Sequence, residues 1–421
     1  MLRAASFIYK PTKVNATILA HLGYATRKLW NVANYEKRNW RKEGGTPFPN
    51  WYHQKRQLKN HFWYKNLPSQ TAQEVLNVLQ QSWDSFFELK RTGGVENPKP
   101  PRFKQRNFNI KFLNNGFKII DRQLRCAISK QQKNYLQEEY SINEKFLFVP
   151  LPKNVELTKV KTIEFIPLLD GSYKVVLVQE YADSPVHAPS EKFMAIDMGI
   201  TNAFTCYDFQ GHSSIFSGRQ WLSVERYFHK QIAHYQAISD AQQHAKGVQY
   251  AKKSKRVLQL YKKKRQQTFH LLHCMTKKVV ELALTQGVET IVMGDLTNIR
   301  KGNNLGKVTN QKLHALPFKK LTDMIRYKAE QVGISVVLMT EEYTSQTCAV
   351  CQPMPAQSYA KKSNRKHRGL YVCQDCHVTM NADVNGAINI SKKYLKGLNA
   401  QSVVVLDTPI LYTFNGQQFV A

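Results

Sequence analysis

The sequence predicts a layered α/β domain that carries a four-cysteine metal ribbon and follows a β-rich N-terminal module interrupted by helices. Strand-like apolar runs alternate with helical patterns after Phe193, which is the order of an α/β domain. Two CxxC pairs interrupt that alternation near the C-terminus. Short β-branched and aromatic runs precede it, after a long helical stretch. A chain of 421 residues exceeds the usual size of one core, so two or three domains are expected.

The N-terminal module is expected to comprise residues 1–14 and 105–185. Its first residues alternate weakly, as in a strand, and short strands return after residue 105. Two of these strands are joined by Asp170-Gly171, a dipeptide typical of hairpin turns. Residues 15–104 interrupt the module with a helical region in which aromatic residues lie among basic ones.

The helical region ends in a basic, proline-rich connector. An amphipathic helix that begins after Leu67 stops at Gly93-Gly94, and residues 97–104 then read Asn-Pro-Lys-Pro-Pro-Arg-Phe-Lys. Proline removes backbone donors and holds the chain extended, so the Arg and Lys side chains are expected to face solvent. A plain linker explains this segment equally well.

The α/β domain is predicted over residues 190–345 and 377–395, with the ribbon at residues 346–376 between them. The expected strands are residues 193–197, 202–207, 289–294 and 335–340, and the expected helices are residues 221–240, 250–285, 316–332 and 382–395. The helix at 250–285 starts with a dense run of Lys and Arg, which favours a phosphate-facing surface over a merely solvated face. Residues 396–421 form a tail without a predicted place.

Charge is the strongest compositional signal. The chain has 61 Lys and Arg against 30 Asp and Glu, a formal net charge of +31. Such an excess predicts a partner with many phosphates, namely a nucleic acid. An anionic membrane surface is the alternative, but no run approaches the roughly 20 apolar residues of a spanning helix, and no secretory signal opens the chain. A cytoplasmic location without membrane contact is therefore expected.

Four of the seven cysteines form two CxxC pairs. Cys348 and Cys351 are followed after about 20 residues by Cys373 and Cys376, a spacing typical of tetrahedral zinc sites. Four thiolates leave no open position for water, so this zinc is expected to be structural. His377 is interpreted as a non-ligand. The basic residues of the intervening loop favour contact with nucleic acid.

Two aspartates occupy positions that suit metal binding. Asp197 ends a buried apolar strand, where an isolated charge is costly unless it binds metal or lies at an open edge. Asp383 lies at a predicted helix start. An ordinary cap or turn explains each residue alone, but together with a third acid they would hold two Mg²⁺ ions around a scissile phosphate.

Four motifs occur in a characteristic order: residues 196–199 (Ile-Asp-Met-Gly), 344–351 (Thr-Ser-Gln-Thr-Cys-Ala-Val-Cys), 373–376 (Cys-Gln-Asp-Cys) and 382–390 (Ala-Asp-Val-Asn-Gly-Ala-Ile-Asn-Ile). In this combination the chain resembles the TnpB family, transposon-encoded relatives of type V CRISPR effectors that are often called transposases. The proline-rich connector also resembles that family's N-terminal half. The resemblance implies an α/β RuvC-like (RNase H-like) domain with an inserted zinc ribbon, and a β-rich wedge module interrupted by a helical recognition region.

The chain departs from the family pattern at the second acidic position. The family usually ends that strand with Glu-Asp-Leu, whereas this chain has Gly294-Asp295-Leu296. Either the nuclease is inactive, or the third acid comes from the neighbouring strand, which ends in Glu341-Glu342; Asp295 is a weaker substitute. Adjacent strands lie about 4.8 Å apart, which a Glu side chain can span. Side chains alternate along a strand, so only one glutamate can point inward, and resemblance to a branch of the family favours Glu341.

The resemblance implies an RNA-guided, Mg²⁺-dependent DNA endonuclease of a transposable element. Asp197, Glu341 and Asp383 would be its catalytic magnesium ligands, beside the structural zinc. A guide RNA and a double-stranded DNA target would be its partners. Two alternatives stay open. One is a nuclease-dead RNA-guided DNA-binding protein or repressor, and the other is a DNA transposase that catalyses strand transfer itself.

Overall fold

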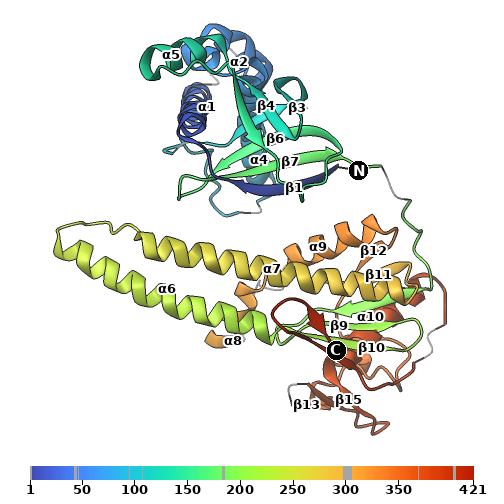
Figure 1. Cartoon of the computed structure of the whole chain (residues 1–421). Coiled ribbons are helices and arrows are strands. Elements are labelled where there is room, and N and C mark those ends of the chain that lie inside the picture. Colours follow the sequence, from blue (N-terminus) through green and yellow to red (C-terminus); the bar gives the residue numbers. More distant parts are fainter. Residues whose placement is uncertain are drawn as a thin grey trace. The chain divides into compact units, whose positions relative to one another are not determined.

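The computed structural model describes residues 2–41, 45, 47–93, 95–106, 108–182, 185–296, 306–367, 369–401 and 404–421. Gly94, expected at a helix end, lies outside these residues. The chain divides into two compact units, Met1–Asp183 and Ser184–Ala421 (Figure 1). No helix of the described chain is long and apolar enough to cross a membrane.

The first unit contains two antiparallel sheets. The larger has the order β1-β7-β6-β2, with β1 (Leu2–Tyr9), β2 (Ile110–Leu113), β6 (Lys159–Pro167) and β7 (Tyr173–Glu180). The smaller has the order β3-β4-β5, with β3 (Phe117–Ile120), β4 (Gln123–Ala127) and β5 (Phe146–Pro150). The turn predicted at Asp170-Gly171 joins β6 to β7, and Gly171 has a φ of 80°, a conformation that favours glycine.

The helices of the first unit are mostly inserted between β1 and β2. They are α1 (Lys13–Asn39), α2 (Trp51–Gln57), the 3₁₀ turn η2 (Leu58–Asn60), α3 (Phe62–Lys65) and α4 (Ser69–Thr92). A further helix, α5 (Lys130–Tyr140), interrupts a stretch for which only strands are expected. The Ser129 hydroxyl accepts a hydrogen bond from the Gln132 amide at 3.2 Å, and this cap precedes residues of good helix propensity.

The basic connector lies along α1 and is held there by side chains. The Trp30 indole donates to the Arg102 carbonyl at 3.2 Å, and the Asn34 amide donates to the Pro101 carbonyl at 2.9 Å. Trp30 is itself only 2% exposed, so it belongs to the core. The side chains of Lys99 and Arg102 remain exposed.

The second unit is built on a seven-stranded mixed sheet of order β12-β11-β8-β9-β10-β16-β17. Its strands are β8 (Phe193–Asp197), β9 (Asn202–Asp208), β10 (Ser213–Ser217), β11 (Thr290–Asp295), β12 (Ser335–Thr340), β16 (Ile410–Phe414) and β17 (Phe419–Val420). The strands β8, β9 and β10 are antiparallel, whereas β8, β11 and β12 are parallel. β8 is therefore the strand at which the direction of pairing changes.

Helices cover both faces of this sheet. They are α6 (Arg219–Ala245), α7 (Lys255–Thr285), α8 (Lys307–Ala315), α9 (Phe318–Gln331) and α10 (Ala382–Gly397). α7 and α9 pack on one face, against Met194, Ile196 and Met293. α10 packs on the other face, against Ala195 and Val292. Successive residues of each buried strand thus pack against helices on opposite faces of the sheet. The strands are therefore apolar on both faces and do not alternate between apolar and polar residues.

The C-terminal residues belong to this sheet rather than forming a separate tail. β16 pairs in parallel with β10, and the Tyr412 ring stacks on Phe216 with centroids 4.8 Å apart. Residues 396–421 carry no charge pattern or motif of their own. A single strand added to a sheet can be recognised only from the strand with which it pairs, so the sequence alone does not predict β16. A second sheet of this unit, of β13 (Arg365–His367), β14 (Leu370–Val372) and β15 (Thr379–Asn381), forms the cysteine-bearing ribbon between β12 and α10.

Candidate active site and cysteine cluster

Asp197 lies at the end of the central strand β8. Its carboxylate reaches toward α10, where a Cβ added to Gly386 would lie 2.3 Å from Oδ2. The glycine therefore leaves the space that the carboxylate occupies. Burial, then the nearby charge of Asp383, raises the pKa of Asp197 to about 7, while Arg365 opposes the shift.

Asp383 is held in the first turn of α10. The Asn381 side chain caps this helix by accepting a hydrogen bond from the Asp383 amide at 2.9 Å. The Asp383 carboxylate accepts a hydrogen bond from the Asn202 side chain at 2.8 Å, and it pairs with the Arg365 guanidinium at 3.3 Å. The two aspartates are thus brought together from β8 and α10, which are far apart in the sequence.

Glu341 follows β12, and its side chain lies over Gly294 of the neighbouring strand β11. A Cβ added to Gly294 would lie 1.6 Å from Glu341 Oε1, which is far inside contact distance. Within the part of the chain that the structure describes, this buried Oε1 has no hydrogen-bond partner. Burial, then the charges of Asp197 and Asp295, raises the pKa of Glu341 to about 8. The structure therefore brings Glu341 to the same site as the two aspartates.

The other two candidate acids point elsewhere. Glu342 is exposed, in the turn that follows β12. Asp295 is also exposed, and it pairs in register with Thr340, one residue before Glu341. It acts on the site through its charge, which helps to raise the pKa of Glu341.

Two basic residues at this site were not predicted as site residues. Lys393 of α10 donates to the carbonyl oxygens of Thr340 and Glu342, at 3.0 and 2.7 Å, and so fixes the turn that carries Glu341. Arg365 comes from the basic loop between the cysteine pairs and contacts Asp383. Neither side chain has a distinctive sequence signal, because a lysine on a helix and an arginine in a loop usually face solvent.

A divalent cation fits these carboxylates. The unpartnered Oε1 of Glu341 and the raised pKa values both indicate a concentration of negative charge that a cation would relieve. Asp197, Asp383 and Glu341 would supply the carboxylate oxygens that hold such a cation.

The four predicted cysteines converge at one point of the ribbon. Cys348 Sγ lies 3.7 Å from Cys376 Sγ, and Cys351 Sγ lies 3.7 Å from Cys373 Sγ. A tetrahedron of thiolates at a zinc–sulfur distance of about 2.3 Å places its sulfurs about 3.8 Å apart. The cluster thus fits a zinc ion with four protein ligands. His377 adopts a positive φ of 59° just after the last cysteine and is not among the four clustered ligands.

Two family models match parts of the chain. The model of a probable transposase (OrfB_IS605) matches residues 175–300, and that of the Cas12f1-like TNB domain matches residues 318–390. The TnpB-like protein ORF457 of Acidianus two-tailed virus is 25% identical over 408 residues, covering 89% of this chain and 83% of that protein. The chain is thus similar to a TnpB-like protein along most of its length.

Other relatives of the chain are nucleases by name. The putative RNA-guided DNA endonuclease InsQ of Escherichia coli (strain K12) is 22% identical, covering 78% of this chain and 75% of that protein. The CRISPR-associated endodeoxyribonuclease Cas12f1 of Sulfoacidibacillus thermotolerans is 32% identical over 131 residues, 31% of this chain and 28% of that protein. The solved structure of the mini-RNA-guided endonuclease CRISPR-Cas_phi3 is 10% identical in sequence. The match covers 94% of this chain and 92% of that chain, with a TM-score of 0.46.

Proposed function

We propose that this protein is an RNA-guided, Mg²⁺-dependent DNA endonuclease of a transposable element. The observation that carries the proposal is the position of Glu341, whose side chain fills the space above Gly294 and supplies an acid beside Asp197. With Asp383, this gives three carboxylates from β8, α10 and the end of β12. Phosphodiester hydrolysis needs such a set to hold its cations.

The second unit is proposed to be an RuvC-like nuclease domain. The order of the strands supports this assignment. The antiparallel strands β8, β9 and β10 come first in the chain, followed by β11, which pairs in parallel with β8, and β12, which pairs in parallel with β11. Helices cover both faces of the sheet. The ribbon is proposed to be a zinc-stabilised insert that brings Arg365 to the carboxylates. The first unit is proposed to be the wedge module, residues 1–14 and 105–185, interrupted by the recognition region at 15–104.

The catalytic roles follow from the geometry. Bound Mg²⁺ would supply an activated water and stabilise charge on the leaving oxygen. Asp197, Glu341 and Asp383 would hold the cations, and Asn202 orients Asp383 through its 2.8 Å hydrogen bond. Lys393 fixes the turn that presents Glu341. The third acid, Glu341, thus comes from the end of β12 instead of from β11. The site therefore keeps three carboxylates although position 294 holds glycine.

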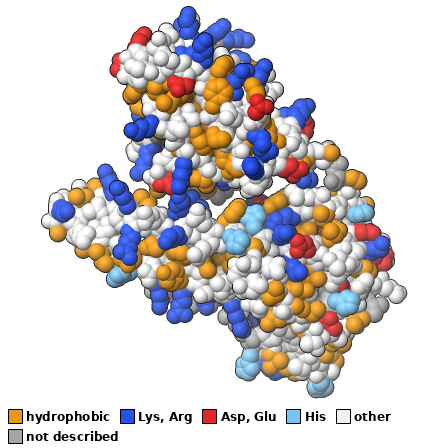
Figure 2. All heavy atoms as spheres, viewed as in Figure 1, with side chains coloured by type: hydrophobic (Ala, Val, Ile, Leu, Met, Phe, Trp, Pro, Cys, Tyr) orange, Lys and Arg blue, Asp and Glu red, His pale blue; other side chains and the backbone are white. Residues whose placement is uncertain are grey.

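The relatives and the charge of the chain support an RNA guide and a double-stranded DNA target. The net charge of +31 matches a polyanionic partner, and Figure 2 shows Lys and Arg side chains spread over much of the face in view. The relatives InsQ and Cas12f1 are an RNA-guided DNA endonuclease and a CRISPR-associated endodeoxyribonuclease by name. Base pairing with the guide would then read the target sequence.

The test is cleavage of a plasmid library with randomised flanks by protein co-expressed with its flanking RNA. We expect cutting with Mg²⁺, none with EDTA, and none by Asp197→Ala or Glu341→Ala, while guided DNA binding persists in both variants. Glu342→Ala is the matched control and should cut normally. Guided binding by the unaltered protein without any cutting would instead favour the nuclease-dead DNA-binding protein, for which Gly294 is the supporting observation.

A further inference from the structure

The small sheet β3-β4-β5 of the first unit has one buried face and one open face. Leu124 and Leu147 point into the core and are fully buried. The opposite face carries Phe148 and Ile120, each 44% exposed, although both are large and apolar. An exposed aromatic ring on the outer face of a sheet is typical of surfaces that stack nucleobases.

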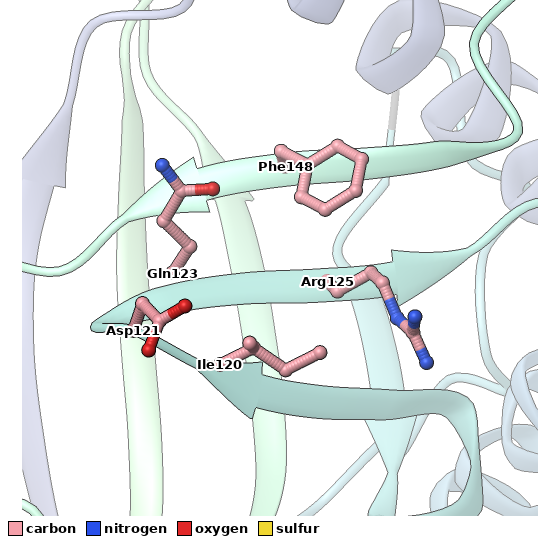
Figure 3. A pocket seen from close by; sticks show the side chains of 5 residues that line it. All are labelled: Ile120, Asp121, Gln123, Arg125 and Phe148. Atoms are coloured by element: carbon pink, nitrogen blue, oxygen red, sulfur yellow. The ribbon is translucent and has the colours of Figure 1, made fainter.

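A cavity of about 230 Å³ opens on this face (Figure 3). It is lined by Ile120, Asp121, Gln123, Arg125 and Phe148. The register explains the grouping, since Gln123 pairs with Ile120 across β3 and β4, and Arg125 pairs with Phe148 across β4 and β5. Paired residues of an antiparallel sheet lie on the same face, so these side chains surround one space.

The rim of the cavity is fixed by the turn between β3 and β4. Asp121 and Arg122 both have positive φ, 47° and 56°, as a two-residue hairpin turn requires. The Arg122 guanidinium donates to the carbonyl oxygens of Pro152 and Val155, at 2.6 and 2.9 Å, and so anchors the turn. In the described chain, neither the Asp121 carboxylate nor the Gln123 side-chain amide has a hydrogen-bond partner, so both are available to a ligand.

Positive charge surrounds the apolar floor. The Arg125 guanidinium lies over the Phe146 ring at 4.6 Å, and Lys133 Nζ lies 5.4 Å from the same ring. Lys118 is exposed and pairs with Arg125 in register. Phosphates would be attracted to these cations, whereas the single carboxylate of Asp121 would repel a phosphate and accept from an N–H group.

We propose that this cavity binds one unpaired, amino-bearing base of an RNA strand. The base stacks on Phe148, its exocyclic amino group donates to Asp121, and Gln123 pairs with the remaining edge. Arg125 and Lys118 contact the flanking phosphates. Adenine, cytosine and guanine each carry an exocyclic amino group, whereas uracil has none and presents carbonyl oxygens that the carboxylate repels. The inference rests on the proposed function, because it gives the RNA partner of the endonuclease a specific contact.

The experiment measures binding of the full chain to labelled RNA octamers of adenosine, cytidine or uridine at one fixed salt concentration. We expect the unaltered protein to prefer the cytidine octamer to the uridine octamer. Phe148→Leu keeps an apolar side chain but removes the ring, so cytidine affinity should fall about fivefold or more. Phe148→Trp should retain it. Asp121→Asn should abolish the preference, because an amide can donate to the uracil oxygen.

Phe87→Leu is the matched control, since Phe87 is 42% exposed in the same unit but lies outside the cavity. Equal cytidine affinity for the unaltered protein and Phe148→Leu overturns the proposal, as does equal loss in the Leu and Trp variants. Dependence on Phe148 for the deoxycytidine octamer but not for RNA also overturns it. Failure of the unaltered protein to bind any of the RNAs, with no guided cutting, would instead count against the proposed function itself.

Discussion

Gly294 and Glu341 act as one structural pair. The glycine has no side chain, and the glutamate occupies the space that a Cβ would take. A residue with a side chain at position 294 and a glutamate at position 341 therefore exclude each other in these conformations. This explains how the usual acidic position can hold glycine while the site keeps a third carboxylate.

We therefore predict that Gly294→Ala lowers cleavage about 100-fold or more, because displacing a catalytic group by about 1 Å can cost that much. Guided DNA binding should be unchanged. Gly397→Ala is the control, since an added Cβ there meets nothing within 4 Å. The measurement is the single-turnover cleavage rate with Mg²⁺. A Gly294→Ala variant that cuts at the normal rate would show that Glu341 is not a catalytic ligand.

The ribbon is the element whose stability we expect to depend most on a metal. Its three short strands cover few residues, and the cysteine cluster joins the segment before β13 to the segment between β14 and β15. We predict that Cys376→Ser lowers bound zinc from about one ion per chain to almost none, because small four-thiolate sites depend on every ligand. Elemental analysis of the purified protein measures this. Cys274→Ser, which changes a cysteine outside the cluster, should retain zinc.

The C-terminal hairpin is the element that closes one side of the large sheet. Phe419 of β17 is 2% exposed and lies 6.0 Å from Phe216, ring centre to ring centre. We predict that Phe419→Ala lowers the free energy of unfolding by about 3–5 kcal/mol. Leu411→Ala should change it by less than about 0.5 kcal/mol, because Leu411 is 52% exposed. Urea titration of both variants decides whether the hairpin is part of the folded unit.

At the scale of the whole molecule, the excess positive charge should control RNA affinity. We predict that the logarithm of the RNA association constant falls linearly with the logarithm of salt concentration. Lys263→Gln and Arg265→Gln, at exposed positions of α7, should each reduce the slope by about one. Lys277→Gln is the control on the same helix, because Lys277 pairs with Glu281 at 3.4 Å. Unchanged slopes in the first two variants would place the RNA elsewhere.

Local patterns predict much of this molecule. The two CxxC pairs indicate the ribbon because each knuckle is encoded by adjacent residues, and the apolar runs before Asp197 and Gly294 indicate strands of the sheet. The neighbouring positions of Gly294 and Glu341 follow from parallel pairing of two predicted strands. The contacts of Lys393 and the pairing of β16 do not follow, because both depend on which distant segments meet in the folded chain.

The late position of α10 in the chain also has a consequence for synthesis. Asn202 and Asp383 are hydrogen-bonded although they lie 181 positions apart in the sequence, so the carboxylate site cannot assemble until α10 has emerged from the ribosome. Until β16 emerges, β10 presents an unpaired edge to other nascent chains. A product truncated before α10 would therefore lack the carboxylate site and carry an aggregation-prone edge.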